Sequence, residues 1–137
     1  MNIKIRNGIE VQAEGGLIIE QAWLQYASGP LVRDGNIINI GEKIKIHLII
    51  QGWKGISDVI SIGATETITT DEGQRLLQSG DMFADYATLS LQAVQKISLS
   101  AIIDDIDRLV DFFRVDFHIW SKMYPEQEIK GYYLFHI

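Results

Sequence analysis

The sequence contains no cysteine and only two prolines among its 137 residues. Without cysteine, the chain cannot form disulfides, zinc–thiolate sites, iron–sulfur clusters or a thiol nucleophile. The scarcity of proline argues against a disordered linker, and the 47% of hydrophobic residues with 22% of charged ones is typical of a globular protein. Because this length suits one domain with one core, we expect residues 1–137 to form a single domain.

Positive charge is also scarce, since 12 lysines and arginines stand against 18 aspartates and glutamates, a net charge of −6. Nucleic-acid binders gain most of their affinity by neutralising phosphates, so we expect no nucleic-acid partner. The longest near-apolar stretch, residues 44–50, is too short to span a bilayer, and no signal-peptide-like apolar run follows the first residues. The sequence therefore predicts a cytoplasmic protein without a membrane span.

Alternation of apolar and polar residues with a period of two dominates the chain and indicates half-buried strands. It is clearest at residues 113–120, where Phe113, Val115, Phe117 and Ile119 share one side. The other predicted strands cover residues 3–11, 16–27, 43–51, 59–69, 97–103 and 131–137.

The segment 16–27 fits a strand only with an irregularity, because Glu20 would face inward together with Ile18, Ala22 and Leu24. An extra residue in the strand, a β-bulge, would correct this. We therefore predict a bulged strand in this segment.

One segment resists the strand interpretation. Residues 104–110 begin with acidic side chains and carry Ile106, Leu109 and Val110 at helical spacing, which favours a short helix crossing between strands. Turn residues separate seven to nine strands, and no alternation of strands with helices is present. The expected fold is an all-β antiparallel sandwich or barrel with one short crossing helix.

The run Gly41-Glu42-Lys43-Ile44-Lys45-Ile46 resembles an early strand of bacterial immunoglobulin-like sandwiches, such as the polysaccharide-binding C-terminal domain of O-antigen ABC exporters. The later elements follow in that order: the turn at residues 71–73, the strand 113–120 and the closing strand with Tyr132-Tyr133-Leu134-Phe135. Together they cover about two-thirds of the chain. The resemblance implies an immunoglobulin-like β-sandwich with a non-catalytic binding role, and it carries over no site residue.

Catalytic signals are few. The sequence contains no nucleophile elbow, phosphate loop, dinucleotide fingerprint or His-Glu-x-x-His run. Its three histidines, His47, His118 and His136, alternate with apolar residues on separate strands. They could converge on a metal such as Zn²⁺, but a surface histidine on each strand is the simpler interpretation. We expect no enzyme, no catalytic residue and no cofactor.

The densest charge run contains Asp104, Asp105, Asp107 and Asp111. Calcium prefers several carboxylate oxygens on one loop, but this spacing lacks the EF-hand pattern and its turn glycine. Carboxylates at the start of a solvated helix explain the run more simply. We therefore assign no metal site.

Alternation directs Arg114, Asp116, His118 and Trp120 to the same outer side of their strand. An aromatic ring beside charged groups suits a sugar or peptide ligand, and these four residues are the predicted ligand-binding site. Trp23 and Trp53 are further outward candidates, although a tryptophan at a strand end or turn commonly covers the core.

The preferred function is therefore a non-catalytic binding module that recognises carbohydrate through an exposed sheet face. The alternative is a protein–protein interaction or assembly domain of a larger bacterial complex. It rests on the aromatic C-terminal strand, which would offer an unprotected edge for homo-oligomer formation if it were not interior.

Overall fold

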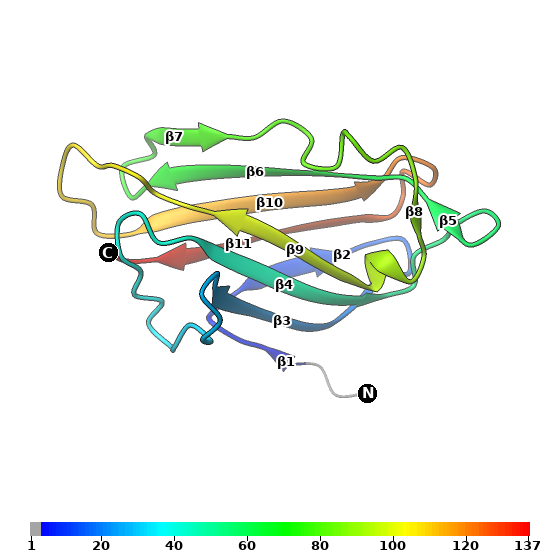
Figure 1. Cartoon of the computed structure of the whole chain (residues 1–137), viewed down its shortest axis with the longest axis horizontal. Coiled ribbons are helices and arrows are strands. Elements are labelled where there is room, and N and C mark those ends of the chain that lie inside the picture. The colour runs from blue at the N-terminus through cyan, green and yellow to red at the C-terminus, as the bar shows by residue number, and fades with distance from the viewer. Residues whose placement is uncertain (1–3) are drawn as a thin grey trace.

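Two β-sheets pack face to face in the computed structural model, which describes residues 4–137 (Figure 1). Sheet A has the strand order β1-β3-β4-β9, and sheet B has the order β2-β11-β10-β6-β7, while β5 and β8 form a separate pair. The elements are β1 (Lys4–Ile5), β2 (Glu10–Ala13), β3 (Ile18–Tyr26), β4 (Ile44–Gln51), β5 (Val59–Ile60), β6 (Ile62–Thr70), β7 (Arg75–Gln78), β8 (Leu89–Ser90), the 3₁₀ helix η1 (Ala93–Gln95), β9 (Lys96–Ala101), β10 (Phe113–Ser121) and β11 (Glu128–Phe135). The β-sandwich predicted from the alternation is confirmed.

Sheet A contains the predicted β-bulge. In the pairing of β3 with β4, Ile19 is opposite Ile50 and Gln21 is opposite Ile49, so Glu20 is the extra residue of the bulge. The extra residue resets the alternation, so Ile19 precedes the bulge as a buried residue and Ala22 and Leu24 follow it as buried residues. Ile18 is 39% exposed, so the prediction that it faces inward was wrong. The pairing of β1 with β3 is parallel and departs from the otherwise antiparallel sheets.

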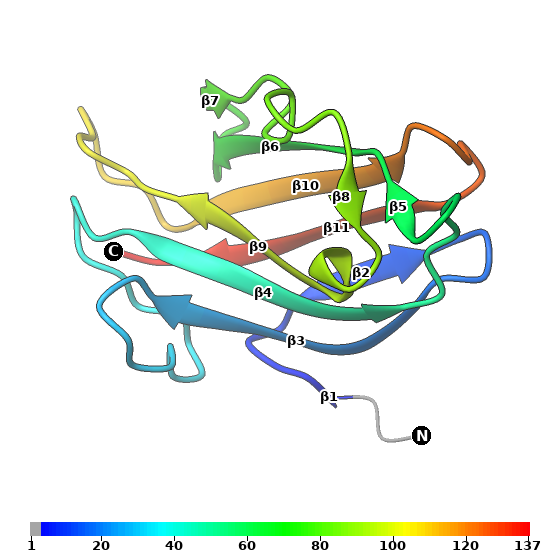
Figure 2. The ribbon, with the colours of Figure 1, turned by 45° about the vertical axis from the view of Figure 1, so that its right-hand side comes forward.

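Sheet B encloses the C-terminal strand. β11 pairs antiparallel with β10 on one side and with β2 on the other. The strand is therefore interior, so the condition under which it would offer an unprotected edge is not met. Within residues 4–137 the edge strands are β1 and β9 of sheet A and β2 and β7 of sheet B. Figure 2 shows β11 between β10 and β2.

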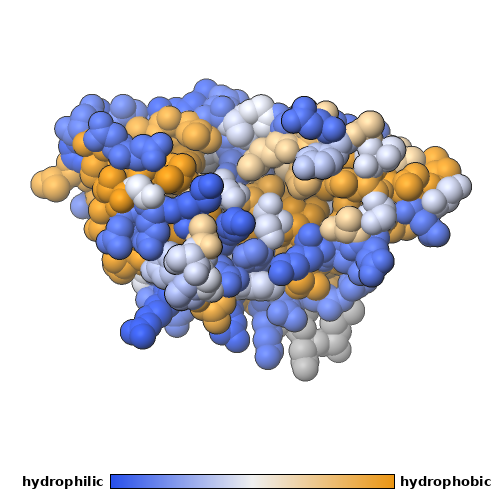
Figure 3. All heavy atoms as spheres, in the orientation of Figure 1, coloured by the Kyte–Doolittle hydropathy of each residue, from blue (hydrophilic) through white to orange (hydrophobic). Residues whose placement is uncertain are grey.

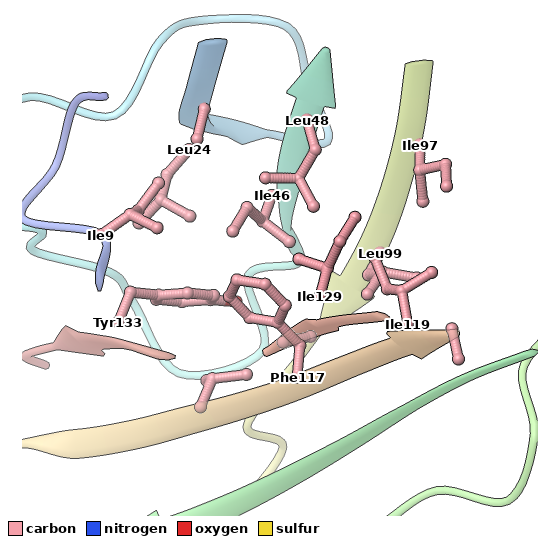
Figure 4. Close-up of a cluster of buried hydrophobic side chains, with 14 of the residues drawn as sticks. Ile9, Leu24, Ile46, Leu48, Ile97, Leu99, Phe117, Ile119, Ile129 and Tyr133 are labelled. Carbon is pink, nitrogen blue, oxygen red and sulfur yellow. The ribbon is translucent and has the colours of Figure 1, made fainter. Parts of the chain in front are cut away.

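The inner faces of the two sheets form one hydrophobic core. Every second residue of β4 and β10 is buried, as period-two alternation requires. Each fully buried aliphatic or aromatic side chain contributes about 1.5–3 kcal/mol relative to an exposed one. Figure 4 shows side chains of the two sheets pointing toward one another, among them Leu24, Ile46, Leu48 and Leu99 of sheet A and Phe117, Ile119, Ile129 and Tyr133 of sheet B.

Two ionisable side chains interrupt this apolar core, and both belong to sheet B. Glu66 is 2% exposed and Tyr133 is fully buried. The Oε1 atom of Glu66 and the hydroxyl of Tyr133 have no hydrogen-bond partner. Burial raises the pKa of the Glu66 carboxyl to about 8, and burial together with the nearby Glu66 raises the pKa of Tyr133 well above its usual value. Glu66 is therefore largely protonated at neutral pH, because charging it without a partner is costly.

The predicted crossing helix at residues 104–110 is absent, and this segment is an irregular connection between β9 and β10. It passes from one sheet to the other, and an extended chain covers about 3.3 Å per residue against about 1.5 Å in a helix. Ile106 and Val110 pack on the core, while Leu109 is 98% exposed, so the helical spacing does not make one buried stripe. The helix prediction was wrong for this reason.

Apolar side chains also reach the surface. Figure 3 shows them most clearly toward the two ends of the molecule, with smaller apolar patches among the hydrophilic residues between the ends. The described residues 4–137 contain no helix with the length and apolar character needed to cross a bilayer.

Candidate ligand-binding site

The outward residues of β10 form a row across the centre of sheet B. Phe113, Val115, Phe117 and Ile119 are buried, so the intervening residues face outward as predicted. The register places Thr65, Thr67 and Thr69 of β6 on one side of this row and Glu128, Lys130, Tyr132 and Leu134 of β11 on the other. The predicted residues Arg114, Asp116, His118 and Trp120 therefore share one outer face, each partly exposed.

This face contains a hollow of about 510 Å³, which we call the sheet B hollow. Four strands supply its lining: Glu10, Val11 and Gln12 of β2, Thr65 and Thr67 of β6, Arg114, Asp116, Phe117 and His118 of β10, and Lys130, Gly131 and Tyr132 of β11. Three of the four predicted site residues line it, and Trp120 does not.

Arg114, Asp116 and Tyr132 form a fixed unit within the hollow. The Arg114 Nε atom donates to both Asp116 carboxylate oxygens at 3.1 Å, and Nη2 lies 3.0 Å from Oδ1. The guanidinium carbon lies 3.8 Å from the centroid of the Tyr132 ring. Ion pairing and the cation–π contact restrict the Arg114 side chain, so its remaining N–H groups are held in place.

His118 links the hollow to a second group of polar residues. Its Nε2 atom lies 3.0 Å from Glu128 Oε2, and Lys130 Nζ lies 3.9 Å from Glu128 Oε1. The imidazole ring also packs against the Trp120 ring, with 4.9 Å between centroids. These contacts hold the imidazole ring between a carboxylate and an indole.

Trp120 covers the backbone of β6, which explains why it does not line the hollow. Its register partner is Gly63, and a Cβ atom built at Gly63 would overlap the indole ring. The ring therefore lies against the sheet at a position where only glycine leaves room.

The other two tryptophans have different environments. Trp53 is 9% exposed and donates from Nε1 to the Val94 carbonyl oxygen at 3.1 Å, so it covers the core and is no outward binding residue. Trp23 lies on the outer face of sheet A, where its ring stacks on His47 at 5.1 Å.

The three histidines lie apart from one another in the fold. His47 is on the outer face of sheet A, where its Nδ1 lies 2.6 Å from Ser98 Oγ, while His118 is on the outer face of sheet B. His136 follows β11, and its Nδ1 lies 2.7 Å from the Asp111 carbonyl oxygen. Among residues 4–137, no group of three or more histidine, aspartate or glutamate side chains is placed to hold a metal ion.

The acidic run at residues 104–111 is held by contacts with the turn after β6. Arg108 Nη1 lies 3.3 Å from Glu72 Oε2, and the backbone N–H of Asp111 donates to Asp71 Oδ2. The run therefore adds its negative charge to one end of the sandwich.

Sequence reasoning missed the residues that β2 and β11 bring to the hollow. Tyr132 and Gln12 are far apart in sequence. The pairing of β10 with β11 places Tyr132 beside β10, and the pairing of β11 with β2 brings Gln12 to the same face. The alternation of β11 contained a partial signal, because it places Lys130 and Tyr132 opposite the buried Ile129 and Tyr133. No local pattern indicates which strands lie beside one another.

No protein-family model matches this sequence, and neither does any curated protein. Among solved structures, the crystal structure of the C-terminal domain of Wzt superposes with a TM-score of 0.57 at 13% sequence identity, covering 98% of this chain and 81% of that chain. The resemblance to the C-terminal domain of an O-antigen ABC exporter, which the sequence suggested, is thereby confirmed as a likeness of fold.

Proposed function

We propose that this chain is a non-catalytic binding module that recognises a carbohydrate in the sheet B hollow. One observation carries the proposal. The Tyr132 ring is partly exposed, and beside it the Arg114 side chain is held in place by its ion pair with Asp116 and its contact with the ring. Sugars offer an apolar face to aromatic rings and hydroxyl groups to charged and amide side chains. The hollow provides both kinds of contact.

The charges around the hollow favour a neutral, hydroxyl-rich ligand. Arg114 and Lys130 supply donors, Glu10 and Asp116 supply acceptors, and Gln12 supplies both. A hydroxyl both donates and accepts hydrogen bonds, so it suits a lining of mixed sign. An anion or a cation would meet one unfavourable charge for each favourable one.

The fold supports the same proposal. The chain has the fold of the C-terminal domain of Wzt, and the resemblance of its sequence to the C-terminal domain of O-antigen ABC exporters implies polysaccharide binding. A binding role without catalysis is what this resemblance implies. At 13% identity the likeness names no sugar and no site residue, so the site rests on the geometry of sheet B alone.

The alternative, an assembly domain, loses its original basis because β11 is interior. Self-association through an edge strand would have to use β1, β2, β7 or β9, of which β7 exposes Leu76 and Leu77. We therefore place this alternative second.

A glycan array of bacterial polysaccharides, followed by calorimetry with the best ligand, tests the proposal. We expect Tyr132→Ala and Arg114→Ala to weaken binding about tenfold or more, because each removes a central contact. Trp120→Ala should weaken it less, since Trp120 lies outside the hollow. Tyr86→Ala, at an exposed tyrosine that does not line the hollow, is the matched control and should bind normally.

Two results would overturn the proposal. One is that no polysaccharide binds the intact chain. The other is that a polysaccharide binds equally well to the Tyr132→Ala and Arg114→Ala variants while both remain folded.

A further inference from the structure

A second hollow, of about 480 Å³, lies at the β1 edge of sheet A. The loop that follows β3 and the end of β1 bound it, and Figure 2 shows both segments on the lower side of the molecule. Buried residues form its floor and more exposed ones its rim: Asn7, Leu24 and Val32 below, with Arg6, Trp23, Leu31, Arg33 and Asp34 around them. We call it the Trp23 hollow.

Backbone hydrogen bonds fix the first arginine of this hollow, Arg6. Its N–H continues the β1–β3 ladder by donating to the Ala22 carbonyl oxygen at 2.9 Å. Its carbonyl oxygen then accepts from the N–H of Ile9 at 3.1 Å, across a turn in which Asn7 and Gly8 have φ of 60° and 66°. Two successive positive φ angles define a tight turn that asparagine and glycine favour. Arg6 therefore stands at the first position of a rigid turn.

A second turn fixes Arg33 in the same way. The N–H of its neighbour Val32 donates to the Leu24 carbonyl oxygen at 3.0 Å, which ties this part of the loop to β3. The Arg33 carbonyl oxygen accepts from the N–H of Asn36 at 3.1 Å. Arg33 is therefore also the first residue of a hydrogen-bonded turn.

The side chains of Asn7 and Asn36 lock the two turns together. Asn7 Nδ2 donates to Asn36 Oδ1 at 3.0 Å and to the Val32 carbonyl oxygen at 2.9 Å, and Asn36 Nδ2 donates to the Asn7 carbonyl oxygen at 2.8 Å. The Leu24 N–H donates to Asn7 Oδ1 at 2.9 Å. Both asparagines are buried, and a buried polar network with its partners in place is rigid. The backbones of both arginines are thus set before any ligand arrives.

The charge around this hollow is positive, unlike that of the sheet B hollow. Among residues 4–137, neither Arg6 nor Arg33 forms an ion pair with a carboxylate within 4 Å. Asp34 is the single acidic residue in the lining. Lys96 adds a further positive charge, because its Nζ lies 5.8 Å from the Trp23 ring centroid. The two arginines therefore leave charged N–H donors available to an anion at this hollow.

Trp23 forms the aromatic wall of the hollow. His47 stacks on the ring at 5.1 Å, and Nε1 donates to Gln25 Oε1 at 3.2 Å, so the indole is held in one orientation. Trp23 is also a lining residue of the hollow. An indole surface beside guanidinium groups accepts a ring that itself carries a negative group.

We propose that the Trp23 hollow binds a ring compound carrying an oxyanion, either a carboxylate or a phosphate. Guanidinium groups recognise both oxyanions with paired N–H donors, and the indole packs against the ring of the ligand. This site is separate from the sheet B hollow, because no residue lines both. The proposal therefore does not depend on the proposed carbohydrate site.

The test is a titration of ¹⁵N-labelled protein at low salt with three probes: glucuronate, glucose 6-phosphate and glucose. The three tryptophans give three indole N–H signals, and the Trp23→Phe variant identifies that of Trp23. We expect saturable shifts of the Trp23 signal with one or both anions. The dissociation constant should be about tenfold larger or more in Arg6→Gln and Arg33→Gln, because each change removes a charged hydrogen-bond donor. Arg75→Gln, on β7, is the matched control and should bind like the unmodified chain.

The three probes separate the sources of the anion. A response to glucuronate alone assigns a carboxylate ligand, and a response to glucose 6-phosphate alone assigns a phosphate ligand. The proposal is overturned if neither anion shifts the Trp23 signal, if glucose shifts it equally, or if the arginine variants bind as tightly as Arg75→Gln. Shifts confined to β10 and β11 would instead report on the sheet B hollow.

Discussion

The two sheets each present a tryptophan–histidine pair on their outer face, but in different electrostatic surroundings. On sheet A, Trp23 stacks on His47 at 5.1 Å, and on sheet B, His118 packs on Trp120 at 4.9 Å. Burial, and secondarily Lys96 and Lys45, lower the pKa of His47. His118 is instead hydrogen-bonded to the Glu128 carboxylate. Neighbouring strands, and not the pair itself, decide the charge of each face.

The inner faces differ as well. The buried residues of β3, β4 and β9 are all aliphatic, whereas sheet B places Glu66 and Tyr133 in the core without hydrogen-bond partners for Glu66 Oε1 and the Tyr133 hydroxyl. An unpaired buried polar group costs stability. These two buried groups therefore lower the stability of sheet B, whereas the buried residues of β3, β4 and β9 in sheet A bring no such loss.

The largest expected effect concerns Glu66. Its pKa is about 8 in the folded chain against 4.5 in the reference state, so the folded protein holds one more proton than the unfolded chain between these values. The free energy of unfolding should therefore fall as pH rises from about 4.5 to about 8 and then level off, and each unit of pKa difference is worth about 1.4 kcal/mol. Glu66→Gln should remove most of this fall and be the more stable protein at pH 9, as urea denaturation at several pH values will measure.

The matched control for this prediction is Glu72→Gln, which removes the same carboxyl group from an exposed side chain. It should keep the pH dependence of the unmodified chain. If Glu66→Gln keeps that dependence too, the core of sheet B contains no titrating group in this range and the contrast between the inner faces fails.

A smaller effect is expected from Gly63→Ala on sheet B. The added Cβ would overlap the Trp120 ring, so the ring must leave its place against β6. Such overpacking typically costs about 1–3 kcal/mol. The change should shift the indole signal of Trp120 strongly and leave that of Trp23 unchanged. Thr65→Ala, on the same strand and face, should do neither; equal effects of the two variants would show that Gly63 is not needed for the Trp120 position.

The smallest effect concerns His47 on sheet A. Burial is the main cause of its lowered pKa, and Lys96 is the next. Lys96→Gln should therefore raise the pKa of His47 part of the way toward its ordinary value, because one repulsive charge is removed while burial remains. Titration of the imidazole signals by NMR measures this. Lys43→Gln is the control, and a His47 pKa that does not respond to Lys96→Gln would contradict a basic face on sheet A.

Much of the fold could be predicted from local patterns. The alternation at Phe113, Val115, Phe117 and Ile119 correctly gave the inner face of β10, and the conflict at Glu20 correctly gave a bulge. Prediction failed where a segment's own residues fit both a helix and an irregular connection. The segment 104–110 has helical spacing but must connect β9 of one sheet with β10 of the other. Its own residues give no sign of that connection.

The candidate site could be predicted only in part, for the same reason. Arg114, Asp116 and His118 follow from one strand, whereas Tyr132 and Gln12 join them through pairing between distant segments. Trp120 has the correct orientation but lies over Gly63, which belongs to a strand more than fifty residues earlier. The Trp23 hollow likewise needs the hydrogen bonds between Asn7 and Asn36.

The sequence alone determined that this protein is an all-β sandwich without cysteine chemistry, because period-two alternation and residue counts are local properties. Tertiary structure alone decided which strands are edges, which tryptophans are buried, and which charges meet across each face. Strand order sets these features, and it depends on contacts between residues far apart in the chain. The two hollows, one of mixed charge and one positive, are products of that order.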